Sequence, residues 1–191
     1  MKVVILAIVL TVLAGATHAV DAVAAADAPL APLFTIDWAQ LKAEGKLTAG
    51  EFFAPRDSGA AATLRLENPN DRPKTFTLIT LDKPGITKSS WVLTGRVSCT
   101  GIVGKGYVEM LHRFPNGTVH FARTMASMGP QAMLQGTEPW RDFATAFRSF
   151  KSGRPSQIVI SVVLPKRGVV ELGRLALYEG DEAVNRALGI K

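Results

Sequence analysis

The feature that most constrains the fold of this chain is the alternation of apolar and polar residues that runs through most of it after residue 61. Successive side chains of a strand point to opposite faces, so this alternation is typical of strands with one buried face. Clusters of Gly, Pro, Asn and Asp separate the alternating stretches, as turns separate strands. The pattern predicts strands over residues 62–67, 75–81, 90–99, 106–114, 118–124, 142–147, 156–164 and 168–178.

Short strands at this spacing, without convincing helices between them, predict an all-β fold. We expect an eight-stranded antiparallel β-sandwich of the jelly-roll kind over residues 34–180. The only long connection between the predicted strands covers residues 125–141, and residues 181–191 are expected to form a C-terminal tail.

A short helical segment is expected before the first strand, within residues 36–47. Trp38, Leu41 and Leu47 would share one face of this helix, and Gly45 would end it.

The N-terminus is typical of a secretory signal peptide, with Lys2 followed by the apolar run 3–15. Cleavage after residue 19 or after residue 26 fits the small residues found there, so residues 1–19 are predicted to be the signal and 20–33 a flexible leader. An uncleaved anchor or a buried helix is the alternative. We expect an exported protein, periplasmic or extracellular, without a membrane span after cleavage.

The chain is basic, with 22 Lys and Arg against 16 Asp and Glu. These cations are spread through the turns and form no run with interleaved aromatic residues, so a nucleic-acid partner is not expected. Cys99 is the only cysteine, which excludes an intramolecular disulfide and a thiolate cluster for zinc. The glycines of 101–106 match neither G-x-G-x-x-G nor G-x-x-x-x-G-K-[ST], the two spacings that bind phosphate groups, and they predict a turn. We expect no cofactor and no metal.

The best-patterned stretch is "GYVEMLHRFPNGTVHFARTM", residues 106–125. Asn116-Gly117 between two runs of strand-forming residues predicts a hairpin closed by a type I′ turn. Alternation places His112 on one face of the first strand, and the opposite face then carries Tyr107, Glu109, Leu111 and Arg113. Arg123 of the second strand is expected to join that opposite face.

Glu109 has two interpretations on this face. The carboxylate is either an acceptor for sugar hydroxyl groups or the ion-pair partner of Arg113 or Arg123. A second candidate position is "GTEPWRDF", residues 136–143. Trp140 would stack on a pyranose ring and Arg141 would hold hydroxyl groups, or Trp140 plugs the sandwich edge and Arg141 pairs with a carboxylate.

The block from residue 62 to residue 178 resembles galactose-binding-like jelly rolls, and more narrowly an uncharacterised group of exported bacterial proteins. The segments "ITKSSWVLTGRV", "GYVEMLHRFPNG", "FARTM", "GTEPWRDF" and "IVISVVLPKRGVVELGRLAL" carry this resemblance. The resemblance implies a β-sandwich and, in some members, carbohydrate binding. Fold alone does not assign a function.

The leading hypothesis is therefore an exported, non-catalytic domain that binds a glycan or a cell-envelope polymer. Its predicted ligand-binding residues are Tyr107, Glu109, Arg113, Arg123, Trp140 and Arg141. One alternative is an enzyme that acts on polysaccharides by pairing Glu109 with Asp142 or Glu138. Another is an accessory envelope protein that binds a protein partner through a sheet face. The sequence leaves the ligand and the oligomeric state open.

Overall fold

A computed structural model describes residues 30–55, 62–149 and 153–190 of the chain. The predicted signal peptide, both cleavage positions and most of the predicted leader lie outside the described residues.

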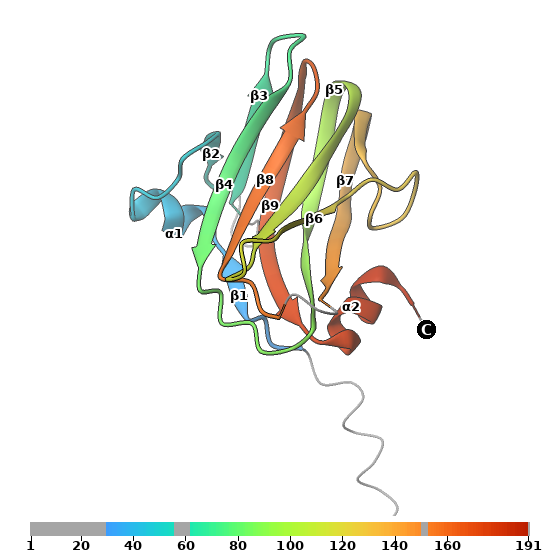
Figure 1. The fold of residues 1–191 in the computed structure, drawn as a ribbon. Helices are drawn as coiled ribbons and strands as arrows, with labels where there is room; N and C mark the ends of the chain where they lie inside the picture. The colour runs from blue at the N-terminus through green and yellow to red at the C-terminus, as the bar shows by residue number, and fades with distance from the viewer. Residues whose placement is uncertain (1–29, 56–61, 150–152, 191) are drawn as a thin grey trace, which may run out of the picture.

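The strands pair antiparallel and form two packed layers, so the predicted antiparallel β-sandwich is confirmed (Figure 1). The strands are β1 (Phe34–Ile36), β2 (Glu51–Phe53), β3 (Thr63–Asn68), β4 (Lys74–Asp82), β5 (Ser90–Arg113), β6 (Val119–Arg123), β7 (Leu134–Arg148), β8 (Gln157–Leu164) and β9 (Gly168–Glu179). One layer, here called the β9 sheet, contains β1, β2, β3, β9, the first half of β5 and β7. The other layer, the β8 sheet, contains β4, β8, the second half of β5 and β6.

Strand β5 belongs to both layers. Residues 90–100 pair with β7 and β9, and residues 107–113 pair with β8 and β6. The predicted glycine turn at 101–106 is wrong, because the strand continues through it. Gly101 and Gly104 take φ values of 61° and 87°, and register shifts in the β5–β7 pairing fall in this stretch. Glycine bulges of this kind let a strand bend from one sheet into the other without leaving its ladder.

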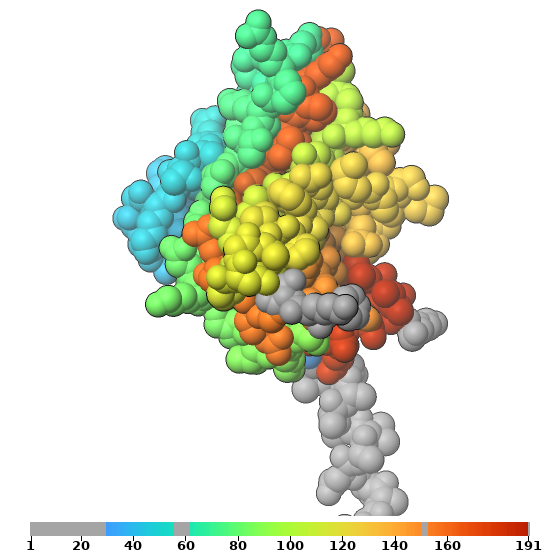
Figure 2. All heavy atoms as spheres, in the orientation of Figure 1, coloured from blue at the N-terminus to red at the C-terminus, as the bar shows by residue number. Residues whose placement is uncertain are grey.

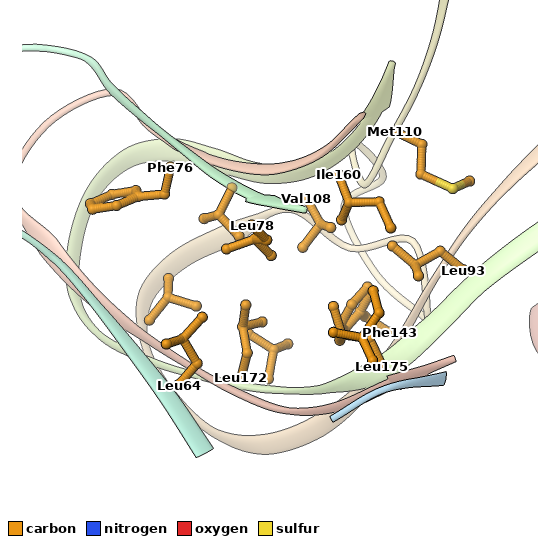
Figure 3. Packing of buried hydrophobic residues seen from close by; sticks show 14 of the residues in the cluster. Leu64, Phe76, Leu78, Leu93, Val108, Met110, Phe143, Ile160, Leu172 and Leu175 are labelled. Atoms are coloured by element: carbon orange, nitrogen blue, oxygen red, sulfur yellow. The ribbon is translucent and has the colours of Figure 1, made fainter. Parts of the chain in front are cut away.

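The core fills the space between the two layers (Figure 3). Leu78, Val108 and Ile160 of the β8 sheet are completely buried, as are Leu64 and Leu172 of the β9 sheet on the opposite side. Each of them lies in a strand in which buried residues alternate with more exposed ones, which explains why the period-two pattern identified the strands.

Helix α1 (Trp38–Ala43) confirms the predicted helical segment. Asp37 caps its N-terminus, since Oδ1 accepts hydrogen bonds from the backbone N–H groups of Ala39 and Gln40. Trp38 is buried and donates from Nε1 to the carbonyl oxygen of Gly173 at 2.8 Å. This bond ties the N-terminal segment to the middle of β9.

The C-terminal residues do not form the predicted tail. Helix α2 (Asp181–Leu188) packs on the outer face of the β9 sheet, where Ala183 and Val184 bury Val92 and Ala144. The helix is short, and the sequence pattern did not indicate it. Within the described residues, no helix has the length and apolar character needed to cross a membrane.

The hairpin at Asn116-Gly117 is present, but its turn is not type I′. Gly117 has a φ of 82°, whereas Asn116 is not among the described non-glycine residues with positive φ. The backbone N–H of Gly117 donates to the carbonyl oxygen of Phe114 at 2.9 Å, and the N–H of Phe114 donates to that of Thr118 at 3.0 Å. A three-residue loop with a glycine in the left-handed region gives this pattern.

Candidate functional site

The outer face of the hairpin carries the aromatic and charged cluster that the alternation predicted. Glu109 lies opposite Arg123 on β6 and opposite Ser161 on β8. Residues directly opposite each other in an antiparallel pair point to the same face, so Tyr107 and Phe121 share this face with the ion pair. His112 points to the interior, as predicted, and is completely buried.

Arg123 is the centre of this cluster. Its Nε donates to Oε2 of Glu109 at 2.5 Å, and its guanidinium carbon lies 5.0 Å from the ring centre of Tyr107 and 4.6 Å from that of Phe121. A guanidinium held by a carboxylate and two aromatic rings is fixed in position before any ligand arrives. The ion-pair interpretation of Glu109 is therefore confirmed for Arg123.

The cluster is open to solvent on its outer side. Phe121 is 48% exposed, and the side chain of Arg123 keeps 39% of its surface accessible while Glu109 beneath it is only 8% exposed. Figure 2 looks onto this side of the molecule, where no described helix covers β6. Thr75, Thr77 and Thr80 of β4 are also exposed on the same sheet.

Phe121 was not among the predicted site residues. Its alternation with Arg123 on β6 was the available signal, because residues two apart in a strand share a face. The predicted Arg113 is exposed at the hairpin end of the face, opposite Val119 and four residue pairs from Glu109.

The other predicted aromatic residue, Trp140, does not join the hairpin cluster. Trp140 and Asp142 alternate on β7 with Arg141 and the buried Phe143, so they lie on the outer face of the β9 sheet. Figure 1 shows β6 and β7 in different layers. Tyr107, Glu109, Arg113 and Arg123 thus lie on one side of the sandwich and Trp140 on the opposite side.

Arg141 points inward and has a structural environment. Its Nε donates to Oε2 of Glu138 at 2.8 Å, and one terminal nitrogen donates to the carbonyl oxygens of Ala132 and Met133, each at 3.1 Å. These bonds fasten the segment before β7 to the strand. The alternative in which Arg141 pairs with a carboxylate is confirmed.

The carboxylate pairs considered for glycosidic cleavage do not come together. Glu109 lies on the outer face of the β8 sheet, whereas Asp142 lies on the outer face of the β9 sheet, and Glu138 is bound by Arg141. Cleavage requires two carboxyl groups on either side of one glycosidic bond. The proposed pairing of Glu109 with either acid is wrong.

The described residues also form a groove of about 830 Å³ between the edge strand β4 and the segment that contains β1 and α1. Ile36, Leu41 and Leu81 contribute apolar surface to it, and Asp37 and Asp82 contribute carboxylates. None of the predicted site residues lines this groove. Its walls come from distant parts of the chain, so no local sequence signal indicated it.

Nothing in the described ranges brings three or more His, Cys, Asp or Glu side chains into an arrangement that would hold a metal ion. Cys99 is buried, and its burial raises the pKa of the thiol to about 11. The cysteine thus behaves as a small apolar core residue.

No protein-family model and no curated protein matches this chain. Solved structures with a similar fold include a xylan-binding domain from Paenibacillus barcinonensis (TM-score 0.43, 12% identity, 79% of this chain and 97% of that one). They also include a family 30 carbohydrate-binding module (TM-score 0.44, 9% identity, 66% of this chain and 82% of that one). A third is tailspike protein 4 of bacteriophage CBA120, at TM-score 0.47 and 10% identity over 66% of this chain but only 16% of that one.

Proposed function

We propose that this chain is a non-catalytic carbohydrate-binding domain whose site is the hairpin face of the β8 sheet. The observation that carries the proposal is Arg123, held by Glu109 between the rings of Tyr107 and Phe121 on an open surface. Sugar rings present apolar C–H faces and hydroxyl rims. An exposed aromatic ring beside a fixed guanidinium and a carboxylate offers a partner to each.

The geometry supports binding more than cleavage. Glu109 is engaged by Arg123, and its opposite neighbour on β8 is the neutral Ser161. A general acid or nucleophile for glycosidic cleavage would need a second carboxyl group across the same sugar. The hairpin face offers a fixed charge pair instead.

The binding test is native electrophoresis toward the cathode, in gels that contain soluble xylan, mixed-linkage β-glucan, galactan or polygalacturonate. We expect at least one of these polysaccharides to retard the protein. Phe121→Ala and Arg123→Ala should each weaken that retardation about tenfold, which corresponds to about 1.4 kcal/mol. Glu109→Ala should act in the same direction, because Arg123 loses the partner that fixes it.

Val119→Ala is the matched control, since Val119 is exposed on the same strand and face but lies four residues from Arg123, opposite Arg113. Retardation that all three cluster variants leave unchanged would overturn the site. A chain that none of the four polysaccharides retards would overturn the function.

A second candidate function, binding of a protein partner, rests on a different observation. Val119, Phe121, Met125 and Met128 are all exposed, and they follow one another along β6 and the segment after it. Exposed apolar residues concentrated in one place mark protein interaction sites. In that case Val119→Ala and Met125→Ala would weaken capture of the partner, whereas the glycan site predicts no effect of Val119→Ala on polysaccharide binding.

We also propose that the chain is exported, on the strength of the charged and apolar N-terminal pattern of residues 1–19. N-terminal sequencing of the protein recovered from outside the cytoplasm tests this proposal. A new N-terminus at residue 20 or residue 27 supports export with cleavage, and an intact Met1 in a cytoplasmic fraction contradicts it.

A further inference from the structure

Trp140 lies on the side of the sandwich that faces away from the hairpin. Trp140 is 37% exposed, and its indole extends over the neighbouring strands of the sheet. Strand β7 pairs with β5, and β5 pairs with β9, so Gly173 on β9 is two strands away from Trp140. A Cβ atom at Gly173 would nevertheless lie only 3.8 Å from Cζ3 of Trp140.

This proximity defines how the indole is oriented. Neighbouring strands are about 4.8 Å apart, so an indole that reaches from β7 toward β9 extends across β5. Trp140 keeps 37% of its surface exposed on this outer side of the sheet. A Cβ atom at Gly173 would fit at ordinary van der Waals distance from Trp140 and from Cβ of Arg96, at 3.4 Å, so only a longer side chain there would press against the ring.

Polar groups surround the exposed indole. The guanidinium carbon of Arg96 lies over the ring, 5.8 Å from the indole centre, and its Nε lies 3.6 Å from Oδ1 of Asp142. Both side chains are well exposed, at 62% and 86%. Two residues after Arg96 on β5, Ser98 donates a hydrogen bond to Glu171 of β9 at 3.3 Å. Arg174 is also exposed, directly after Gly173 on β9, so two guanidinium groups with two carboxylates give the surface no excess of positive charge.

We infer that Trp140 is the platform of a second glycan site, specific for an uncharged pyranose polymer. The inference rests on the proposed function, because the ligand class is the same. A flat ring face stacks on the C–H face of a sugar, and the surrounding charges bind its hydroxyl groups. The chain would then hold two polysaccharide strands at once, one on each side of the sandwich.

The surroundings of Trp140 favour a glycan over a protein partner. Helix α2 covers the apolar part of this outer face, where Val92 and Ala144 are buried. What remains open beside Trp140 consists mainly of charged and hydroxyl side chains. The centre of a protein interface is depleted of charged residues, whereas a single ring within a polar frame suits one sugar unit.

The test uses the full chain in isothermal titration with xylohexaose, cellohexaose and galactohexaose, followed by turbidity with the corresponding long polymers. We expect two sites per chain for one of these oligosaccharides. Trp140→Ala should remove one of them and the Phe121→Ala, Arg123→Ala double variant the other. Only a chain with both sites should cross-link the polymer and raise the turbidity.

Gly173→Asn is a second variant that keeps the indole but places a side chain against it. It should weaken the Trp140 site about tenfold, and near-ultraviolet circular dichroism reports whether the fold is retained. The matched control is Arg148→Gln, which changes a charge on the same strand, eight residues from Trp140, and should leave both sites unchanged.

The outcomes separate the two proposals. One site, lost in the hairpin double variant and unaffected by Trp140→Ala, would overturn the second site and leave the proposed function standing. One site lost in Trp140→Ala alone would overturn both the two-site inference and the hairpin site. An absence of binding to all three oligosaccharides, together with no retardation in the polysaccharide gels, would overturn both proposals.

Discussion

Trp91 and His112 share a hydrogen bond in the interior of the sandwich, where Nε1 of Trp91 donates to Nε2 of His112 across 3.0 Å. Both side chains are completely buried. Because Nε2 accepts, the proton of the neutral imidazole must be on Nδ1. Burial lowers the pKa of His112 to about 4.

This pair predicts that stability falls on acidification. The unfolded chain takes up a proton near the ordinary pKa of 6.5, whereas folded His112 does so only near 4. The unfolded state therefore binds more protons between these values. We expect the free energy of unfolding to fall by about 3 kcal/mol as the pH is lowered from 6.5 to 4. Denaturant unfolding at a series of pH values measures this slope.

His112→Phe should remove this part of the pH dependence, although the variant is less stable at neutral pH because Trp91 loses its acceptor. His120→Gln is the companion variant. His120 lies directly opposite His112 and contributes less than burial does to the lowered pKa of His112, so most of the slope should remain. An unchanged slope in His112→Phe would show that other groups control the acid sensitivity.

Gly95 and Gly173 form a matched pair for testing close packing in the β9 sheet. A Cβ atom at Gly95 would overlap Cδ2 of Leu175 and lie 2.9 Å from Cε1 of Phe143, whereas one at Gly173 meets no atom closer than 3.4 Å. We expect Gly95→Ala to lower the free energy of unfolding by about 1–3 kcal/mol. Gly173→Ala should be nearly neutral in the same urea titration, and equal effects would contradict the packing argument.

Cys99 should react only slowly with thiol reagents in the folded protein. The thiol is buried and its pKa is raised to about 11, so little thiolate forms at pH 8. We expect iodoacetamide to label Cys99 much more slowly in the native protein than in urea, as followed by mass spectrometry. Rapid labelling of the native chain would mean that the region around Cys99 opens easily.

Helix α2 should be required for stability because it covers apolar residues of the β9 sheet. Val184→Asp would place a carboxylate against Val92 and Ala144, and we expect a loss of at least about 2 kcal/mol in thermal or urea unfolding. Glu182→Gln on the same helix is the control. It breaks an exposed ion pair with Arg186, and such pairs contribute less than about 0.5 kcal/mol.

The fold was largely predictable because, in a strand with one buried face, every second residue is apolar. The same rule failed at Gly101 and Gly104, where glycines that resemble a turn instead form bulges within β5. It also missed α2. The apolar face of this helix is short, and it is stabilised by packing on Val92 and Ala144, which are distant in the sequence. The alternation shows which residues share a face but not where the chain bends.

The candidate site was predictable only within one hairpin. Tyr107, Glu109 and Arg123 come together because register and alternation are local properties of two adjacent strands. Trp140 was assigned to the same site, yet β7 joins the other sheet, and pairing between distant strands leaves no local pattern. Gly173, which lies near Trp140 in the structure, is on β9, far from Trp140 in the sequence, and it has no side chain that would have suggested a role.

The passage of β5 from one layer to the other has a consequence for how the molecule unfolds. Each layer includes a part of the same strand, so neither can detach while the other keeps its hydrogen-bonded ladder. Unfolding should therefore be a single cooperative event, with amide hydrogens on both halves of β5 exchanging at the same slow rate. Each outer surface also includes a residue of this strand, Arg96 on one side and Glu109 on the other, so tension between molecules bound at the two surfaces would be carried along its covalent backbone.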